Sequence, residues 1–411
     1  MTSAPDPATS AAPPVRRNLV LAVCCMSLLM VSMDATIVNV ALPAIRRDLA
    51  ASTSGLQWVI DAYTMVVASL LMLAGSLADR FGRRRTFQTG MVVFTVGSAL
   101  CSAAPGLDSL VAFRVVQALG ASMLNPVAMS IITNTFIEPR ARARAIGVWG
   151  AVVGITMALG PLIGGGLTQA VGWRSIFWIN LPLGAAAIVL AQRFVPESKA
   201  PRARRIDPVG QVLVLAALAS LTYAVIEGPS HGWGSPLIAG LFAVTAASVV
   251  ALVVYEPRQA EPLLDLRFFH SVPFASATVI AITLYSAFSG YLFLTALYLQ
   301  EVRGLAAFET GLYTLPLALA MTACAPISGR LIGSHGTRPS LVTAGAAIAA
   351  SALCLTRLDH ATSLAWLVVI YVILGVGIGL GNPPITHTAV SGMPRARAGL
   401  AAAVASTSRQ V

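Results

Sequence analysis

The chain has 411 residues, of which 56% are hydrophobic and only 10% are charged. A soluble globular protein carries about 25% charged residues, so this composition excludes a soluble domain and indicates a chain that crosses a membrane many times. The formal net charge of +11 would be compatible with nucleic-acid binding, but the positions of the arginines, given below, exclude that function.

The chain begins with a tail and continues with a series of apolar runs. Residues 1–18 are rich in Ala, Pro, Ser and Thr, which predicts a disordered tail. The first run after this tail is too long for a cleavable signal peptide, so we expect it to stay in the membrane. A span needs roughly 20 apolar residues. Runs of this kind lie near residues 19–43, 56–76, 87–104, 109–132, 146–170, 176–195, 208–226, 236–255, 273–299, 310–332, 340–357 and 364–384.

A thirteenth apolar segment starts at Gly399 and is cut off at Val411. The expected fold class is therefore all-α and multi-pass, with about 12 complete helices and a truncated thirteenth. We divide the chain into the tail, a six-helix bundle at 19–195, a linker region at 196–272 and a shortened second bundle at 273–411. The linker region contains two polar loops and the inserted helix pair 208–226 and 236–255.

The basic residues indicate how the chain is oriented. With the N-terminus inside, alternate loops hold 20 of the 27 basic residues, five lie in the other loops, and Arg114 and Arg409 lie within apolar segments. This bias follows the positive-inside rule and predicts a cytoplasmic N-terminus. The basic charge therefore reflects membrane topology, and we expect no nucleic-acid partner.

A charged, glycine-containing hairpin occurs twice, each time between two apolar runs. The first copy is GSLADRFGRRR at 75–85, and the weaker second copy is GRLIGSHGTRP at 329–339. Four positions recur, because Gly75, Leu77, Gly82 and Arg84 have the counterparts Gly329, Leu331, Gly336 and Arg338. The repeat predicts a transporter built from two related bundles. The alternative is that any cytoplasmic turn between membrane helices is basic and rich in glycine.

We interpret the first copy as a cytoplasmic gate. Asp79, next to Arg80 and Arg83, indicates a charge latch at the helix ends. The residues that we assign to this gate are Gly75, Asp79, Arg80, Gly82, Arg83 and Arg84. Gly333 stands in the second copy where Asp79 would be, so we expect the latch to be stronger in the N-terminal half.

Asp34 lies deep inside the first span, where a carboxylate costs roughly 2.5–3.5 kcal/mol at the helix centre. Such a residue usually faces a wet cavity. Asp34 could titrate with a transported proton or contact a partner helix to set a gate. The alternative is a carboxylate that is hydrogen-bonded between helices without a role in transport.

Arg114, Gln117, Ala121 and Asn125 follow one another at steps of three and four, which places them on one face of the fourth span. A guanidinium there stays charged and needs water, carbonyls or a carboxylate as partners. A nearby Arg114 would favour the ionised form of an aspartate, which proton coupling could use. The alternative is that Arg114 extends to the outer membrane surface.

Two further features lie in the second and fifth spans. Asp61, near the outer end of the second span, could meet a cationic substrate or could be a solvated residue at a helix end. In the fifth span, Gly160, Pro161, Gly164 and Gly165 combine a helix kink with small side chains, which suits a seal between two bundles. Ordinary packing of small residues is the alternative.

Nothing in the sequence predicts an enzyme. There is no phosphate-binding loop, no paired metal ligands and no Gly-x-Ser-x-Gly motif. The five cysteines all fall within apolar runs and indicate free thiols that fill space. We therefore expect no metal and no cofactor, and transport that runs on an ion gradient.

Together these motifs resemble the major facilitator superfamily, and specifically its fourteen-helix drug:proton antiporters. Asp79, Gly82 and Arg83 match the family's loop between helices two and three, and the inserted helix pair fits the same branch. Arg114 and Gln117 match its fourth-helix Arg-x-x-Gln, for which the resemblance implies a part in proton coupling.

The remaining motifs of that branch also have counterparts. Residues 160–165 are similar to the fifth-helix antiporter motif, which marks exporters, although the family's preceding glycine is Thr156 here. Residues 34–43 and 173–182 are similar to its first-helix motif and to its link into helix six. Arg409-Gln410 matches a pair early in helix thirteen, after which the family has a further helix, so we expect this sequence to be a fragment.

The expected function is export of a small amphipathic compound, an antibiotic or another lipophilic molecule, in exchange for protons. The chain resembles antibiotic exporters of actinomycetes. We expect a monomer in the lipid bilayer of a bacterial cell membrane, with Asp34 and Arg114 on the proton side. One alternative is a nutrient or metabolite transporter of the same fold, which the glycines of the fifth span disfavour. The other is a membrane sensor or scaffold that does not transport.

Overall fold

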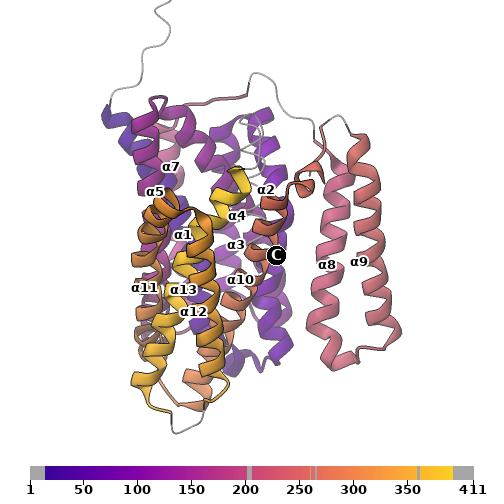
Figure 1. Cartoon of the computed structure of the whole chain (residues 1–411), viewed down its shortest axis with the longest axis vertical. Coiled ribbons are helices and arrows are strands. Elements are labelled where there is room, and N and C mark those ends of the chain that lie inside the picture. The colour runs from indigo at the N-terminus through magenta and orange to yellow at the C-terminus, as the bar shows by residue number, and fades with distance from the viewer. Residues whose placement is uncertain (1–13, 201–205, 260, 264–265, 359–361, 392–411) are drawn as a thin grey trace, which may run out of the picture.

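The computed structural model describes residues 14–200, 206–259, 261–263, 266–358 and 362–391 (Figure 1). Within these residues all regular structure is helical, and 11 helices are long and apolar enough to span a membrane. The all-α, multi-pass fold predicted from the sequence is therefore confirmed. The segment from Gly399, with Arg409 and Gln410, lies outside the described residues.

The first bundle follows the predicted order of spans. Its helices are α1 (Pro14–Leu49), α2 (Thr53–Phe81), α3 (Arg83–Ser102), α4 (Leu107–Thr135), α5 (Pro139–Ala170), α6 (Ser175–Trp178) and α7 (Asn180–Phe194). The short α6 and α7 together make one span. Because α1 starts at Pro14, residues 14–18 belong to this helix and not to a disordered tail. Residues 1–13 lie outside the described part of the chain.

Helix α3 is the one expected span that is absent from the 11 found in the described part of the chain. It begins with three arginines, which lower its apolar content. It packs against α2, α4 and α7. Glycines bring α3 and α4 unusually close, because a Cβ on Gly97 would lie 2.5 Å from the Cα atom of Gln117. A Cβ on Gly120 would lie 2.2 Å from the backbone nitrogen of Phe94.

The inserted pair, α8 (Pro208–His231) and α9 (Pro236–Tyr255), stands beside α2 at the edge of the molecule (Figure 1). Two polar contacts fix α8 to α2. Gln211 donates a hydrogen bond of 2.7 Å to the carbonyl of Ser69, and the indole of Trp58 donates one of 2.9 Å to Glu227. These contacts lie near the two ends of α8, so α8 is fixed to α2 at both of its ends.

The second bundle contains the remaining helices. Two short 3-10 helices, η1 (Glu256–Arg258) and η2 (Leu266–His270), precede α10 (Val272–Leu297), the π-helical turn η3 (Tyr298–Val302), α11 (Ala307–His335), α12 (Thr337–Leu355) and α13 (Leu364–Ser391). Its core is apolar and includes an edge-on pair of rings, Tyr291 and Tyr371, with centroids 5.3 Å apart.

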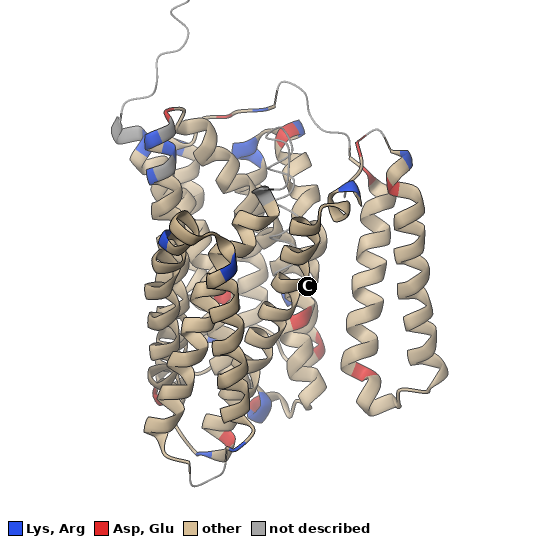
Figure 2. Cartoon of the chain, in the orientation of Figure 1, with Lys and Arg blue, Asp and Glu red and all other residues tan. Residues whose placement is uncertain are grey.

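Charged residues concentrate toward the ends of the helices (Figure 2). We call the end of the first bundle that carries the α2–α3 hairpin and the start of α5 the basic end. Its arginines are Arg80, Arg83, Arg84, Arg85, Arg140, Arg142 and Arg144. The end at which α1 stops and α2 starts is called the opposite end. The two bundles meet mainly through α5 against α11 and α1 against α10.

Candidate functional site

Asp34 and Arg114 form a buried ion pair between α1 and α4. An Arg114 guanidinium nitrogen lies 2.5 Å from Oδ2 of Asp34, and the two side chains are 1% and 0% exposed. The guanidinium also donates to the carbonyl of Val59 and to Oε1 of Gln117, at 3.0 and 2.7 Å. It lies 4.0 Å from the centre of the Tyr63 ring. Arg114 therefore points into the bundle, which excludes the alternative that it extends to the membrane surface.

Amide and hydroxyl groups complete the shell around this pair. Gln117 donates to Oδ1 of Asp34 at 2.8 Å, and Asn180 donates to the same oxygen at 3.4 Å. Both amides also donate to the hydroxyl of Ser98, at 3.2 and 3.0 Å. Five helices, α1, α2, α3, α4 and α7, thus supply one hydrogen-bonded network inside the bundle. Such a network stabilises two charges that would otherwise be very costly in an apolar interior.

A central cavity of about 390 Å³ lies between the two bundles. Helices α1, α2, α4 and α5 line it from one side, and α10, α11 and α13 line it from the other. Arg114 and Tyr63 are part of its wall, whereas Asp34 is not. The expectation that Asp34 faces a wet cavity is therefore wrong. Its carboxylate is buried behind the wall and contacts one residue of the wall, Arg114.

Asp61 is the carboxylate that the cavity wall does contain. It is partly exposed, and no hydrogen bond or ion pair joins it to another residue in the part of the chain that the structure describes. Asp61 sits two turns into α2, close to the depth of Arg114, so it is not a solvated residue at a helix end. On the side of the second bundle the lining contains no charged side chain. The charges at the described cavity wall all come from the first bundle.

The α2–α3 hairpin at the basic end is held by a residue that the sequence motifs did not single out. Arg83 pairs with Asp79 at 3.0 Å, which is the predicted latch within the hairpin. The carboxylate of Glu197 accepts from the backbone nitrogens of Arg84 and Arg85, at 3.1 and 3.3 Å. Glu197 thus caps the N-terminus of α3, where unpaired N–H groups favour an anion.

The repeated hairpins have the same backbone turn. Gly82 ends α2 and precedes α3 with a φ of +112°, and Gly336 ends α11 and precedes α12 with a φ of +80°. Only glycine adopts such angles without strain. Around Gly82 a side chain is also excluded by contact, because a Cβ would lie 2.6 Å from Glu197. Gly336 has open space around it. Gly75 likewise has no neighbour within 4 Å, and Arg80 is exposed.

The glycines of α5 are sites of close helix contact. A Cβ on Gly160 would lie 2.0 Å from Thr36, and one on Gly164 would lie 2.4 Å from Ile37, both on α1. A Cβ on Gly165 would lie 2.3 Å from the carbonyl oxygen of Ala307 on α11. Helix α5 therefore packs against α1 on one side and against the second bundle on the other.

Pro161 takes part in the same contact between bundles. The helix continues through this proline to Ala170. The carbonyl oxygen of Pro161 lies 2.4 Å from where a Cβ on Gly311 of α11 would be placed. Glycines on both helices, Gly165 on α5 and Gly311 on α11, thus allow the two helices to pack closely.

Two polar contacts also join the bundles at the opposite end. Arg46 pairs with Glu301 at 2.8 Å, and Gln300 donates a hydrogen bond of 2.8 Å to the carbonyl of Val40. Each contact joins α1 of the first bundle to the π-helical turn η3 of the second. The bundles are therefore held together at the end away from the arginine-rich hairpin.

The sequence pointed to Asp34, Arg114, Gln117 and the glycines, but it did not single out several of their partners. Ser98, Asn180 and Glu197 were missed as site residues because serine, asparagine and glutamate are common near helix ends and in helix contacts. The signal available for Asn180 was the motif around it at residues 173–182. Among the described residues, no group of three or more His, Cys, Asp or Glu side chains could hold a metal ion.

The sequence is similar to proteins named for drug and antibiotic resistance over nearly its whole length. It is 38% identical over 386 residues to the Multidrug resistance protein Stp of Mycobacterium tuberculosis, covering 94% of this chain and 72% of that protein. It is 36% identical over 387 residues to the Tetracenomycin C resistance and export protein of Streptomyces glaucescens, with the same coverage of 94% and 72%. It is 37% identical over 406 residues to the Puromycin resistance protein pur8 of Streptomyces alboniger, covering 97% and 80%.

Solved structures share the fold. A POT family transporter in complex with a thioalcohol-conjugated peptide superposes with a TM-score of 0.70 at 17% identity, covering 96% of this chain and 87% of that one. A bacterial homologue of the lysosomal transporter Spinster, in an inward-facing conformation, gives 0.66 at 19% identity, covering 97% and 81%. The family model of the Major Facilitator Superfamily matches residues 24–411. With two bundles, a central cavity between them and this match along the sequence, the chain belongs to the Major Facilitator Superfamily.

Proposed function

We propose that this chain exports a small amphipathic compound from the cell in exchange for protons. The observation that carries the proposal is the central cavity of about 390 Å³ between the bundles, with Asp61 and Arg114 in its wall. A cavity near mid-depth, lined by both bundles, is the site that alternating access requires. The lining combines aromatic and aliphatic side chains with a comparable number of polar ones, which suits an amphipathic ligand.

The names of the relatives support the direction of transport. Proteins 36–38% identical to this chain are named for multidrug resistance, for tetracenomycin C resistance and export, and for puromycin resistance. Resistance by transport requires movement out of the cell. We therefore place this chain among exporters of antibiotic-like compounds, and neither an enzymatic activity nor a cofactor is needed for that task.

Asp34 and Arg114 are proposed to carry the proton-linked step. A proton on Asp34 would remove the negative charge that faces the Arg114 guanidinium at 2.5 Å. Arg114 would then be a buried cation without its counter-ion, a state that costs several kcal/mol and favours rearrangement of α1 against α4. Because Arg114 also lies in the cavity wall, this rearrangement would reach the substrate.

Asp61 is proposed to meet the substrate. Its carboxylate faces the cavity without a partner among the described residues, so a cationic group can approach it without breaking an existing ion pair. Asp61 and Asp34 then have separate tasks. Asp61 selects the substrate by its charge at the cavity wall, and Asp34 binds and releases protons behind that wall.

We propose that the chain lies in the bacterial inner membrane with the arginine-rich hairpin on the cytoplasmic side, and the N-terminus is then inside. With this orientation the contacts of α1 and α5 with the second bundle form the outer seal, and Gly75, Asp79, Arg80, Gly82, Arg83 and Arg84 belong to the inner gate. A monomer suffices, because one chain supplies both sides of the cavity.

The test is transport by purified protein in vesicles of known orientation. With a proton gradient imposed, we expect ethidium, a fluorescent amphipathic cation, to move opposite to the protons, which a pH-sensitive dye records in the same vesicles. A protonophore should stop ethidium movement. Ethidium movement in the same direction as the protons would indicate an importer, and movement insensitive to the protonophore would contradict proton exchange.

A further inference from the structure

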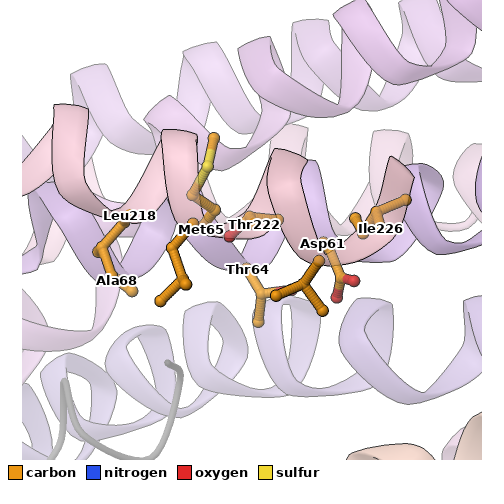
Figure 3. A pocket seen from close by; sticks show the side chains of 9 residues that line it. Asp61, Thr64, Met65, Ala68, Leu218, Thr222 and Ile226 are labelled. Carbon is orange, nitrogen blue, oxygen red and sulfur yellow. The ribbon is translucent and has the colours of Figure 1, made fainter. Parts of the chain in front are cut away.

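A second cavity, of about 240 Å³, lies between α2 and the inserted helix α8 (Figure 3). Its lining comes from two faces. Helix α2 contributes Asp61, Thr64, Met65 and Ala68, and helix α8 contributes Leu218, Leu221, Thr222, Val225 and Ile226. The cavity lies between the two contacts that fix α8 to α2, Gln211 with Ser69 and Trp58 with Glu227. Helix α8 is thus fixed to α2 near both of its own ends, and the cavity lies between these two contacts.

This lateral cavity shares part of its wall with the central cavity. Asp61 and Thr64 line both of them. One turn of α2 therefore stands between the space inside the transporter and the space beneath the inserted pair. A ligand that contacts Asp61 from the lateral side is already at the residue that borders the central cavity.

The polar groups of the lateral cavity favour a cation. Asp61 has no hydrogen-bond or ion-pair partner among the described residues. The hydroxyl of Thr64 donates its proton to the carbonyl of Ile60 at 2.7 Å, which leaves its oxygen to act as an acceptor. No arginine, lysine or histidine lines the cavity. The remaining lining is aliphatic apart from Thr222, so a charged group of negative sign would find no compensation there.

The cavity is partly open and adjoins α8, which stands at the edge of the molecule, where lipid would surround it in a membrane (Figure 1). Leu221 and Val225 line it and are 37% and 52% exposed on the surface of α8. An apolar cavity of about 150 Å³ in another protein holds benzene, so a cavity of 240 Å³ accommodates an aromatic ring with a small head group.

From these observations we infer that the cavity between α2 and α8 binds a lipophilic organic cation that arrives from the bilayer, with its charged group against Asp61. The inference rests on the proposed function in one respect, which is that this cation is the compound that the central cavity exports. The inserted pair then provides a lateral site at which the substrate waits beside the transport path.

The test measures the charge preference of the cavity without any transport. Thr222→Cys places a thiol in the lining, and its labelling is followed by peptide mass spectrometry with a trimethylammonium methanethiosulfonate and with the neutral methyl methanethiosulfonate. Both reagents react with the thiolate form of the cysteine. The ratio of the cationic reagent's rate to the neutral reagent's rate therefore does not depend on the fraction of thiol that is ionised. We expect the ratio to fall about tenfold when Asp61→Asn is added, because a nearby carboxylate attracts the cationic reagent.

The control thiol is Val244→Cys on α9. Ser220 of α8 and Thr245 of α9 are hydrogen-bonded at 2.7 Å, so Val244 lies at nearly the depth of Thr222. Val244 is 47% exposed and does not line the cavity. The ratio of the two labelling rates at Val244→Cys should stay the same when Asp61→Asn is added. An equal response at both thiols, or no response at Thr222→Cys, would overturn the inference.

Occupancy is tested with two compounds of the same shape. Phenyltrimethylammonium should protect Thr222→Cys from the neutral reagent, whereas the uncharged tert-butylbenzene should not. Equal protection by both would mean that the cavity takes any apolar group, including a lipid chain, and would overturn the preference for a cation. Because labelling needs no proton gradient, these outcomes are independent of whether the chain exchanges protons for substrate.

Discussion

Asp34 and Arg114, 80 positions apart in the sequence, form an ion pair of 2.5 Å inside the first bundle, with both side chains almost fully buried. Arg114 touches the central cavity and Asp34 does not. A change of charge on Asp34 would therefore be transmitted to the cavity through Arg114.

The first prediction concerns Asp34→Asn. The amide keeps the shape of the side chain but leaves the Arg114 guanidinium without its counter-ion, so we expect proton-driven efflux to be lost. We also expect the bundle to lose about 3–5 kcal/mol of stability, the usual cost of removing one partner of a buried pair. Efflux of ethidium, together with protein abundance in the membrane, is the measurement, and full efflux in this variant would contradict a role in coupling.

The second prediction is that removing both charges restores stability but not transport. In the variant Asp34→Asn with Arg114→Gln, neither side chain is a buried charge, so most of the stability lost in the single variant should return. A thermal unfolding midpoint in detergent reports this recovery. If efflux returned along with stability, the pair would have a structural task only.

The third prediction concerns Asp61→Asn. Since Asp61 is the carboxylate in the described wall of the central cavity, its loss should reduce export of a cationic probe by about tenfold or more and leave a neutral probe nearly unchanged. Asp61→Glu keeps the charge and serves as the matched control. Equal loss for cationic and neutral probes would show that Asp61 does not select the substrate by charge.

The sequence allowed the helical fold, the two-bundle arrangement and the main contact residues to be predicted, because each depends on local signals. Apolar runs predict spans, and Arg114 with Gln117 follow helical spacing. The partners of these residues come from helices far away in the chain. Nothing local in the sequence places Asn180 against Asp34, Ser98 against Gln117 or Glu197 against the start of α3, since these contacts depend on how the helices pack.

The same limit explains the error about Asp34. The cost of a carboxylate in a span predicts that it has a partner, but both a cavity and a buried cation satisfy that requirement. Which of the two is present depends on which side of α1 faces α4. Because α1 is apolar or weakly polar on several sides, its sequence does not determine that rotation.

The fourth prediction compares two glycines with similar backbone angles. Gly82→Ala and Gly336→Ala both place a side chain at positive φ, which costs of order 1–3 kcal/mol. At Gly82 the new Cβ would also meet Glu197 at 2.6 Å and displace the cap of α3, whereas Gly336 has open space. Gly82→Ala should therefore lower the thermal midpoint more. Equal effects would mean that Glu197 adds nothing to the hairpin.

The fifth prediction concerns the contact between α5 and α11. A Cβ on Gly165 would lie 2.3 Å from a backbone oxygen of Ala307, so Gly165→Ala must push the helices apart and should reduce efflux strongly. The neighbouring Gly166 is the control, because its Cβ would meet only Phe308 at an ordinary 3.7 Å. The measurement is the efflux rate of the Gly165→Ala and Gly166→Ala variants at equal abundance in the membrane. Similar rates would contradict a seal at Gly165.

The last prediction tests whether the end away from the arginine-rich hairpin must open during transport. Arg46 and Glu301 join the two bundles there at 2.8 Å. A short bis-methanethiosulfonate, which forms a disulfide with each thiol and releases methanesulfinate, applied to Arg46→Cys with Glu301→Cys should lock that end and stop efflux, and reduction of the two disulfides should restore it. Asp48 and Arg174, paired at 2.6 Å within the first bundle at the same end, supply the control. Cross-linking Asp48→Cys with Arg174→Cys should leave efflux intact, because it joins parts that move together. Continued efflux with the first pair locked would mean that substrate passes without separation of the bundles at this end, and alternating access by rocking of the bundles would then be wrong for this chain.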